Sequence, residues 1–355
     1  MCIFLCFFYL LCNNLDVDKL LVNQIKQKGK IKMNLTNNNQ NQSENSKLIP
    51  IFFATDDNYV PMLAVALYSL VKHSSPTNQY NVYVLNTGLS PESVETLSKY
   101  ARKNVCIQFV DIKEDLQSVL SKLHTRDYFT ISTYYRLFIP RIFPQYDKAL
   151  YLDSDIIILD DIANLYNVDI KDNLIGAVPE QAVGNIYEFV QYSNKYLGIC
   201  EKLYFNAGIL VMNLKQLRES NFEDDFVALL NKVKFTVAQD QDYLNVICKD
   251  KVHYLPLRWN RTPFGKCSED ENNGIVHFFL TYKPWHYDNV PFESKFWALA
   301  KEAGMFDRIL AIKSKYTDKD REHDNEWFVR LKQTALNEAN SEKPFCKMEI
   351  AGATV

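Results

Sequence analysis

Short apolar runs alternate with amphipathic segments in the chain that follows residue 47. Three of these runs predict β-strands, at residues 50–54, 81–85 and 105–111. The segments between them predict helices: 61–73 carries apolar residues at helical spacing, and a second helix begins after Ser90 with proline at its first position. This alternation predicts an α/β fold with a mostly parallel, Rossmann-like sheet and helices on both faces.

The later part of the chain adds further buried strands and a helical end. Strands are predicted at 174–178, within 204–213 and at 274–279. Helices are predicted over 132–146, over 214–230 and from Asp240 onward. From Ser294 the pattern is helical and charged, which predicts a helical C-terminal extension.

One apolar run, Ala149 to Leu159, carries two carboxylates. Ile, Leu and Tyr surround Asp153 and Asp155, which predicts a buried strand whose two acids point to the same side. Two like charges there cost free energy unless a cation lies between them, and a divalent metal with oxygen ligands is such a cation. The alternative is a strand that stops at Asp153, followed by a turn at Ser154 and Asp155.

The N-terminal region differs in composition from the rest. Residues 1–47 combine an apolar stretch, Met1 to Cys12, with an Asn/Gln-rich linker that we expect to be disordered. Twelve residues are too few to span a bilayer as a helix. We therefore expect a catalytic domain over 48–293 and a helical extension and tail over 294–355.

Composition and charge argue against several classes of function. A net charge of −3 gives no electrostatic case for nucleic-acid binding. The eight cysteines form no Cys-x-x-Cys pair, so the sequence predicts neither a zinc framework nor a disulfide scaffold, and a cytoplasmic location is expected. No Gly-x-Gly-x-x-Gly follows the first strand, which counts against a dinucleotide-binding fold.

Six short motifs together resemble glycosyltransferase family 8. They are Ala54-Thr55-Asp56-Asp57-Asn58-Tyr59, Tyr135-Arg136-Leu137, Tyr151-Leu152-Asp153-Ser154-Asp155, Phe205-Asn206-Ala207-Gly208, Gln239-Asp240-Gln241-Asp242, and His277 with Lys283-Pro284-Trp285-His286. Each motif alone is common by chance, but their order and spacing are specific. The resemblance covers about residues 50–300 and is greatest to bacterial lipopolysaccharide-type galactosyl- and glucosyltransferases. It implies a GT-A fold and a retaining, metal-dependent enzyme that uses a UDP-sugar.

The resemblance also implies roles for single residues. Asp153, Asp155 and His277 would ligate Mn²⁺ or Mg²⁺. His277 by itself would more simply be a core histidine. Residues expected to contact the donor are Ala54, Asp56 and Asn58 at the uridine, Arg136, Asn206 and Ala207 at the sugar or phosphates, and Lys283 at the diphosphate. By its neighbours alone, Arg136 could equally be a surface arginine with a packed stem.

Three residues are expected at the reacting sugar. Asp240 and Gln241 would line its face, with front-side attack favoured over a covalent intermediate. Glu180 would stand where an aspartate is common in the family. An acidic helix start such as the one at Asp240 also serves the helix dipole. At the position of a glycine that approaches the diphosphate, this chain has Leu280, so a changed loop is expected there.

Aromatic residues have two interpretations. Trp285 and the tyrosines at 187, 192, 196 and 204 could stack on sugars or pack in the core. The aromatics within 294–333 could contact a membrane surface at its inner face, although the acids among them favour an ordinary amphipathic cover. The expected acceptor is a saccharide or glycolipid of lipopolysaccharide or cell-surface glycan synthesis. Two alternatives stay open: a UDP-sugar-binding protein without turnover, and a metal-dependent nucleotidyl- or phosphotransferase.

Overall fold

The computed structural model describes residues 48–117, 119, 122–123, 130–264 and 272–348. The predicted apolar stretch and linker at 1–47 lie outside the described residues. The division into a catalytic domain and an extension near residue 293 stays a prediction.

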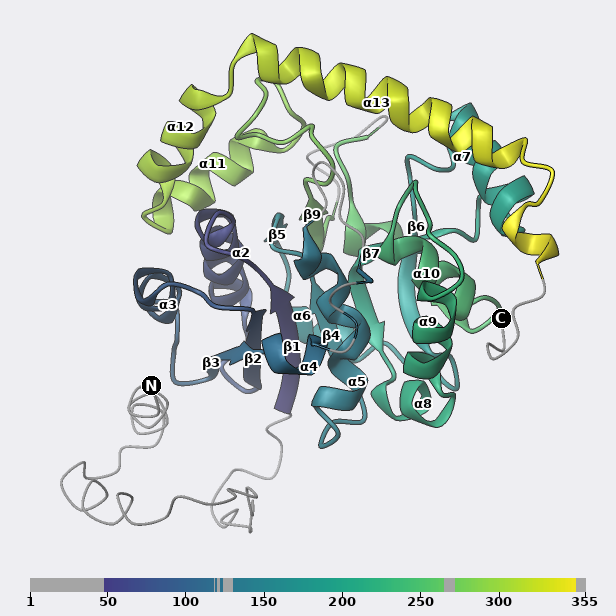
Figure 1. Cartoon of the computed structure of the whole chain (residues 1–355). Helices are drawn as coiled ribbons and strands as arrows, with labels where there is room; N and C mark the ends of the chain where they lie inside the picture. Colours follow the sequence, from purple (N-terminus) through teal and green to yellow (C-terminus); the bar gives the residue numbers. More distant parts are fainter. Residues whose placement is uncertain (1–47, 118, 120–121, 124–129, 265–271, 349–355) are drawn as a thin grey trace.

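A seven-stranded sheet runs through the centre of the molecule (Figure 1). Its strand order is β3-β2-β1-β4-β7-β6-β8. The strands are β1 (Leu48–Ala54), β2 (Gln79–Asn86), β3 (Val105–Asp111), β4 (Ala149–Leu152), β6 (Ile175–Pro179), β7 (Phe205–Met212) and β8 (Val252–Tyr254). Strands β3, β2, β1 and β4 are parallel, β7 is antiparallel to both β4 and β6, and β8 is parallel to β6. The predicted α/β fold with a mostly parallel sheet is confirmed.

Helices cover both faces of this sheet, as predicted. Successive residues of a strand point to opposite faces, so in β1 Phe52 joins one apolar cluster while Ile51 and Phe53 join the other. One face is covered by α2 (Val60–His73), α3 (Pro91–Ser98), α6 (Ile162–Tyr166), α11 (Glu293–Glu302) and α12 (Phe306–Lys315). The other is covered by the 3₁₀ helix η2 (Ile131–Phe138), α5 (Ile139–Ile142), α7 (Tyr187–Gln191), α8 (Leu214–Glu219), α9 (Phe222–Leu230), α10 (Asp240–Ile247) and α13 (Asp318–Ala339).

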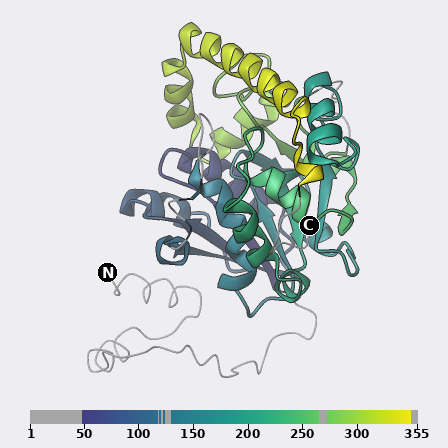
Figure 2. The ribbon, with the colours of Figure 1, turned by 45° about the vertical axis from the view of Figure 1, so that its right-hand side comes forward.

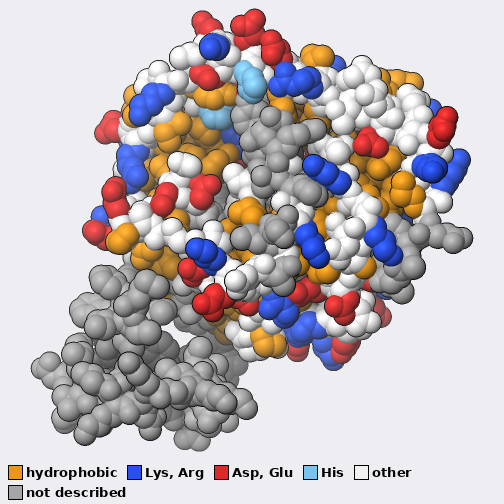
Figure 3. Space-filling view, viewed as in Figure 1, with side chains coloured by type: hydrophobic (Ala, Val, Ile, Leu, Met, Phe, Trp, Pro, Cys, Tyr) orange, Lys and Arg blue, Asp and Glu red, His pale blue; other side chains and the backbone are white. Residues whose placement is uncertain are grey.

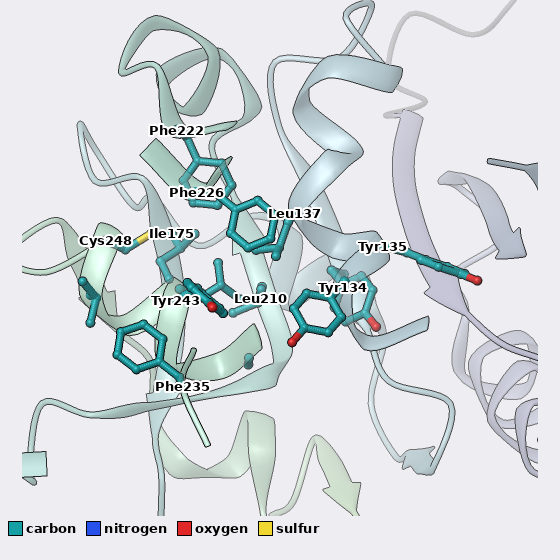
Figure 4. Packing of buried hydrophobic residues seen from close by; sticks show 14 of the residues in the cluster. Tyr134, Tyr135, Leu137, Ile175, Leu210, Phe222, Phe226, Phe235, Tyr243 and Cys248 are labelled. Carbon is teal, nitrogen blue, oxygen red and sulfur yellow. The ribbon is translucent and has the colours of Figure 1, made fainter. Parts of the chain in front are cut away.

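Aromatic side chains dominate the second of these clusters. Phe226 packs edge-on against Tyr243, with ring centroids 5.3 Å apart (Figure 4). Phe226 also packs edge-on against Phe138. Phe235 meets the same Tyr243 ring from another side. This packing fixes α9 and α10 against the sheet, and α10 carries two of the predicted site residues.

The predicted strand over 149–159 is interrupted, which corrects one expectation. β4 ends at Leu152, and the chain leaves the main sheet to form β5 (Ile156–Ile158), which pairs with β9 (Ile275–His277) in a separate two-stranded sheet. Asp153 and Asp155 therefore lie in the connection between two strands, not within one. The geometry of a single strand does not bring them together, and their convergence has to come from the tertiary structure.

Two predicted helices are also divided. The segment 214–230 forms α8 and α9, separated at Asn221, whose φ of 57° lies in the left-handed region that asparagine tolerates better than most residues. The segment 132–146 forms η2 and the short α5. Apolar periodicity predicted the helical character of both segments but not these breaks.

The remaining short elements are α4 (Lys113–Leu116), the π-helix η3 (Tyr192–Leu197), and the 3₁₀ helices η4 (Leu257–Asn260) and η5 (Phe345–Lys347).

The helical C-terminal extension is confirmed, and its longest helix crosses the top of the molecule. In both ribbon views α13 runs from α12 to α7 above the ends of the central strands (Figures 1 and 2). Its inner side buries Trp327, Leu331 and Ala335 at helical spacing.

Acidic and basic side chains are interspersed over the face in Figure 3. Within the described part of the chain, no helix is long and apolar enough to cross a membrane.

Candidate active site

Asp153, Asp155 and His277 converge on one point. One ligand atom from each of the three side chains lies within 4.8 Å of the others. His277 Nε2 is 3.2 Å from Asp155 Oδ1 and 3.7 Å from Asp153 Oδ2. The pairing of β5 with β9 sets Ile156 opposite His277, so the two-stranded sheet brings the histidine to the acids. Two carboxylates and an imidazole at this spacing can hold a divalent metal.

A chain of amides fixes the orientation of the His277 ring. The Gly208 backbone N–H donates to Asn206 Oδ1, which identifies that atom as the oxygen. Asn260 Nδ2 donates to the same oxygen at 2.8 Å, so Asn260 Oδ1 faces His277 Nδ1 at 3.0 Å. An amide oxygen only accepts, and therefore Nδ1 carries a hydrogen and Nε2 is the nitrogen directed at the two aspartates. With Nδ1 held in this way, Nε2 is the atom that could bind a metal.

Gly208 is required at this point by close approach. A Cβ on Gly208 would lie 2.3 Å from His277 Cε1 and 2.6 Å from Asp153 Oδ2. Its carbonyl oxygen accepts a hydrogen bond from the Asp153 N–H at 2.7 Å. Any side chain here would displace two of the three candidate ligands.

Arg136 is buried and not a surface arginine. Its guanidinium donates to Asp153 Oδ1 at 3.0 Å and to the Ala207 carbonyl oxygen, lies 3.2 Å from Asp240 Oδ2, and stacks over the Tyr151 ring. Burial raises the pKa of Asp240 to about 6, although Arg136 acts in the opposite direction. One cation thus links the candidate metal site to the start of α10.

Lys283 is the second buried cation. Its Nζ donates to Asp155 Oδ2 and, at 2.9 Å, to the Tyr59 hydroxyl. Burial alone would raise the pKa of Asp155, but Lys283 and His277 together hold it below its usual range. The Lys283 ammonium therefore stays charged and directed at the metal-ligand cluster.

The loop after β1 borders the same site. Asp56 Oδ1 accepts hydrogen bonds from the N–H groups of Asn58 and Tyr59 and so closes the turn into α2. Ser154, between the two metal-ligand candidates, donates to the Ala54 carbonyl oxygen at 2.8 Å. The first loop and the Asp-Ser-Asp connection are thereby held together.

Gln241 is held by two contacts at the cavity wall. Its Oε1 accepts from the Ala207 N–H at 2.9 Å and its Nε2 donates to the Tyr204 hydroxyl at 3.3 Å. Tyr204 in turn donates to Asp242 at 2.7 Å. Asp242 was not predicted as a site residue. Its carboxylate lies in the core, accepting from two tyrosines and the Ala238 N–H, and burial raises its pKa to about 6.

Glu180 is buried to the same extent as Asp240 and lines the same cavity. Its Oε2 accepts from Asn206 Nδ2 at 2.5 Å and its Oε1 from the Ala182 N–H. Burial raises the pKa of Glu180 above its usual range. Through Asn206 this carboxyl group continues the amide chain that ends at His277.

All thirteen predicted site residues line one cavity of about 610 Å³. They are Ala54, Asp56, Asn58, Arg136, Asp153, Asp155, Glu180, Asn206, Ala207, Asp240, Gln241, His277 and Lys283. The structure thus brings the residues together, while their individual roles stay predictions. The volume lies within the range of small-molecule sites.

Leu280 adopts a backbone conformation that favours glycine. Its φ of 56° lies in the left-handed region, which costs a non-glycine residue about 1–3 kcal/mol. The side chain is half-buried, lines the cavity and packs against the apolar cluster that includes α13. The loop after β9 therefore keeps a glycine-type turn despite its leucine.

The predicted aromatic residues divide between core and surface. Tyr192, Tyr196 and Tyr204 are buried in the core and Tyr187 is 67% exposed. Trp285 is also buried, and it borders the cavity. Of these rings, Tyr192, Tyr204 and Trp285 line the cavity.

Three residues that matter here were not predicted as site residues. Asn260 orients His277, Tyr59 pairs with Lys283, and Gln239 precedes α10 with a φ of 46°. Tyr59 and Gln239 belong to motifs that the sequence showed, but Asn260 belongs to none. The partners of Asn260 and Tyr59 are 17 and 224 positions away in the chain, so no local pattern could have identified these contacts.

Comparison with known proteins identifies the class to which this site belongs. Residues 50–289 match the model of glycosyl transferase family 8. The chain belongs to this family and is a glycosyltransferase.

Individual relatives agree with that assignment. The chain is 27% identical to general stress protein A of Bacillus subtilis over 262 residues, covering 68% of this chain and 88% of the relative. It is 25% identical to a lipopolysaccharide 1,2-glucosyltransferase of Escherichia coli over 259 residues, covering 66% and 73% of the two chains. Among solved structures, it is similar to the galactosyltransferase LgtC in complex with donor and acceptor sugar analogs, with a TM-score of 0.61, 28% identity, and 72% and 96% of the two chains covered. That similarity confirms the GT-A fold.

Proposed function

We propose that this glycosyltransferase moves a hexose, galactose or glucose, from a UDP-sugar to a saccharide or glycolipid acceptor, with a divalent metal and retention of the α-configuration. One observation carries the proposal: Asp153, Asp155 and the Nε2 of His277, whose Nδ1 is paired with Asn260, converge in the cavity that also holds all the predicted donor residues. The family supports the reaction class. The galactosyl- and glucosyltransferases among its relatives support hexose donors and a lipopolysaccharide or related glycan acceptor.

The three candidate ligands fit a metal ion. Gly208 leaves no room for a side chain beside them, and His277 directs its Nε2 to the same point as both carboxylates. An imidazole beside carboxylates suits Mn²⁺, and Mg²⁺ is the alternative. When bound, such an ion supplies Lewis-acid stabilisation of charge on the diphosphate leaving group.

The other residues of the cavity bind and orient the donor. Lys283 is a buried, permanently charged cation, which suits the negative charge that develops on the departing UDP. In this proposal Asp56 and Asn58 hold the base and ribose, and Ala54 leaves space for the ring. Arg136, Asn206 and Ala207 contact the sugar or its phosphates.

Front-side attack fits the contacts of Asp240 and Gln241. A covalent intermediate needs a free nucleophile against the anomeric carbon. Asp240 lies 3.2 Å from Arg136, and both ends of the Gln241 amide are engaged. These contacts suit residues that orient and stabilise the sugar. A sugar–enzyme adduct on either residue, seen by mass spectrometry, would contradict this mechanism.

The test is a panel of UDP-sugars with Mn²⁺, in which UDP release is measured. We expect release from UDP-galactose or UDP-glucose, and a loss of at least about 100-fold in Asp155→Ala, since ligand loss removes the Lewis acid. Asp147→Ala is the matched control, because Asp147 precedes β4 and its side chain is 81% exposed.

Two outcomes would favour other functions. A protein that binds UDP-sugars with Mn²⁺ but releases no UDP would be a binding protein without turnover. Preferential turnover of nucleoside triphosphates would instead indicate a nucleotidyl- or phosphotransferase. Full activity in Asp155→Ala would defeat the metal-dependent mechanism.

A further inference from the structure

Asp324 is a buried carboxylate in the N-terminal third of α13. It is 2% exposed, and its Oδ2 accepts hydrogen bonds from the hydroxyls of Tyr287 at 2.7 Å and Tyr316 at 2.6 Å. A carboxylate on the inner side of a helix costs free energy that an apolar residue would not. The two short hydrogen bonds from the tyrosine hydroxyls offset that cost. The Asp324 carboxylate thereby joins α13 to the segments that contain Tyr287 and Tyr316.

Tyr287 belongs to the turn that carries Lys283. The Lys283 carbonyl oxygen accepts from the N–H groups of both His286 and Tyr287, at 2.9 Å each. From outside the turn, Arg321 of α13 donates to the His286 carbonyl oxygen at 3.1 Å, and Lys313 of α12 donates to the Tyr287 carbonyl oxygen at 2.8 Å. α12 and α13 thus hold the turn through the Tyr287 side chain and through the backbone carbonyl groups of His286 and Tyr287.

The same two helices also reach the cavity itself. Tyr316, directly after α12, stacks on His286 with ring centroids 3.9 Å apart and an interplanar angle of 2°. His286, Tyr316, Ile312 and Leu331 all line the cavity. α12 and α13 begin at residues 306 and 318, beyond the segment 50–289 that matches the family model. This part of the cavity wall therefore comes from outside the matched segment.

We propose that Asp324 is a positioning residue: through Tyr287 and Tyr316 it holds the turn that presents Lys283, which makes the C-terminal helices a working part of the active site. The inference rests on the proposed function in that Lys283 meets the diphosphate of the donor. Lys283 Nζ reaches Asp155 and Tyr59 from a turn whose other end is fixed by Asp324. Loosening that end moves the ammonium relative to the leaving group, and small displacements of a catalytic group lower rates strongly.

A double-mutant cycle tests the link between Asp324 and Lys283. UDP release from UDP-galactose and UDP-glucose with Mn²⁺ is measured for Asp324→Ala, Lys283→Ala and the double variant. We expect kcat/KM for the donor to fall about tenfold in Asp324→Ala, and to change little on adding Asp324→Ala to Lys283→Ala. Equal losses in both backgrounds would overturn the proposal, because Asp324 would then act independently of Lys283.

Two further variants separate positioning from folding. Tyr287→Phe removes only one hydroxyl and should reproduce part of the loss, with the same dependence on Lys283. Asp320→Ala removes the capping carboxylate at the start of the same helix, 3 residues after Thr317, and should leave kcat/KM near the wild-type value. An equal loss in Asp320→Ala would attribute the effect to helix stability and overturn the proposal.

Hydrogen exchange tests, without any substrate, whether Asp324 holds the turn that contains His286 and Tyr287. Amides of His286 and Tyr287 should exchange about fivefold faster in Asp324→Ala and Tyr287→Phe, and at the wild-type rate in Asp320→Ala. Unchanged exchange in Asp324→Ala would overturn the proposal. Absence of UDP release by the wild type would count against the proposed function alone, since the exchange result stands apart from it.

Discussion

Asp240 and Asp242, on either side of Gln241, belong to two clusters of buried groups. In one cluster the acids pair with cations, and in the other the acid accepts hydrogen bonds from neutral donors. The charged cluster consists of Asp153, Asp155 and Asp240 with the cations Arg136 and Lys283. The tyrosine cluster consists of Asp242 with the hydroxyls of Tyr192 and Tyr204 and the Ala238 N–H. Asp240 and Asp242 are only two residues apart at the start of α10, and burial raises the pKa of each to about 6.

The difference shows which acids are available to a ligand. The side chains of Asp153 and Asp155 are 25% and 13% exposed, and they line the cavity with their cations. In the proposed function, a metal and the diphosphate of the donor replace these ion pairs. Asp242 is fully buried and its partners are neutral donors. Its carboxylate fixes the positions of two tyrosines, and one of these contacts Gln241.

Removing the cation from the charged cluster should have the largest effect on stability. Arg136→Met leaves Asp240 buried without its charge partner, and we expect the free energy of unfolding to fall by about 3–5 kcal/mol. Arg141→Met is the matched control, because Arg141 pairs with Asp115 and Glu223 at the surface and should cost less than about 1 kcal/mol. Urea unfolding measures both. Similar losses of unfolding free energy in the two variants would show that the buried Arg136–Asp240 pair contributes no more to stability than the surface pairs of Arg141.

The pH dependence of stability should report the tyrosine cluster. Because the pKa of Asp242 is raised from 3.8 to about 6, its ionisation penalises the folded state, and this penalty grows as the pH rises through that window. Relative to Asp242→Asn, the wild type should therefore lose up to about 3 kcal/mol between pH 4 and pH 7. Unfolding curves that stay parallel across this range would contradict the shifted pKa.

Metal should act on the charged cluster alone. At Mn²⁺ concentrations about 100 times the dissociation constant, we expect about 2.7 kcal/mol of stabilisation, seen as a rise in Tm. Asp155→Ala should abolish the rise, and Asp242→Asn should retain it. A Tm rise that survives in Asp155→Ala would place the metal elsewhere.

The smallest expected effect distinguishes the two tyrosines. Tyr192→Phe and Tyr204→Phe each remove one hydroxyl from Asp242 and should each cost about 1–2 kcal/mol of stability. Only Tyr204 also contacts Gln241, so only Tyr204→Phe should lower the rate of UDP release. Equal rates for the two variants would show that the Tyr204 contact does not orient Gln241.

Much of the fold could be predicted from the sequence because its signals are local. Alternation of apolar runs with helical periodicity gave β1, α2, β2, α3 and β3 nearly at their observed bounds. The same signals failed at Asp153, where apolar residues continue on both sides but the chain passes from one sheet to another. Strand propensity does not record which partner a strand pairs with.

The candidate site was predictable to a similar degree. The residue types of Asp153 and Asp155 pointed to a metal, whereas His277 was added to them only by the family resemblance. Arg136 shows the limit, because its neighbours in sequence fitted a surface residue as well as a buried one. Its two acidic partners lie 17 and 104 positions away, and only packing decided between the two interpretations.

The sequence by itself determined the alternation of elements, the identity of the candidate ligands and the glycosyltransferase family. The tertiary structure alone decided three things: the orientation of His277 through Asn260, the different partners of Asp240 and Asp242, and the contribution of α13 to the cavity wall. The reason is physical. Propensity and periodicity act over a few residues, whereas hydrogen bonds, ion pairs and burial join residues that the fold brings together from distant parts of the chain.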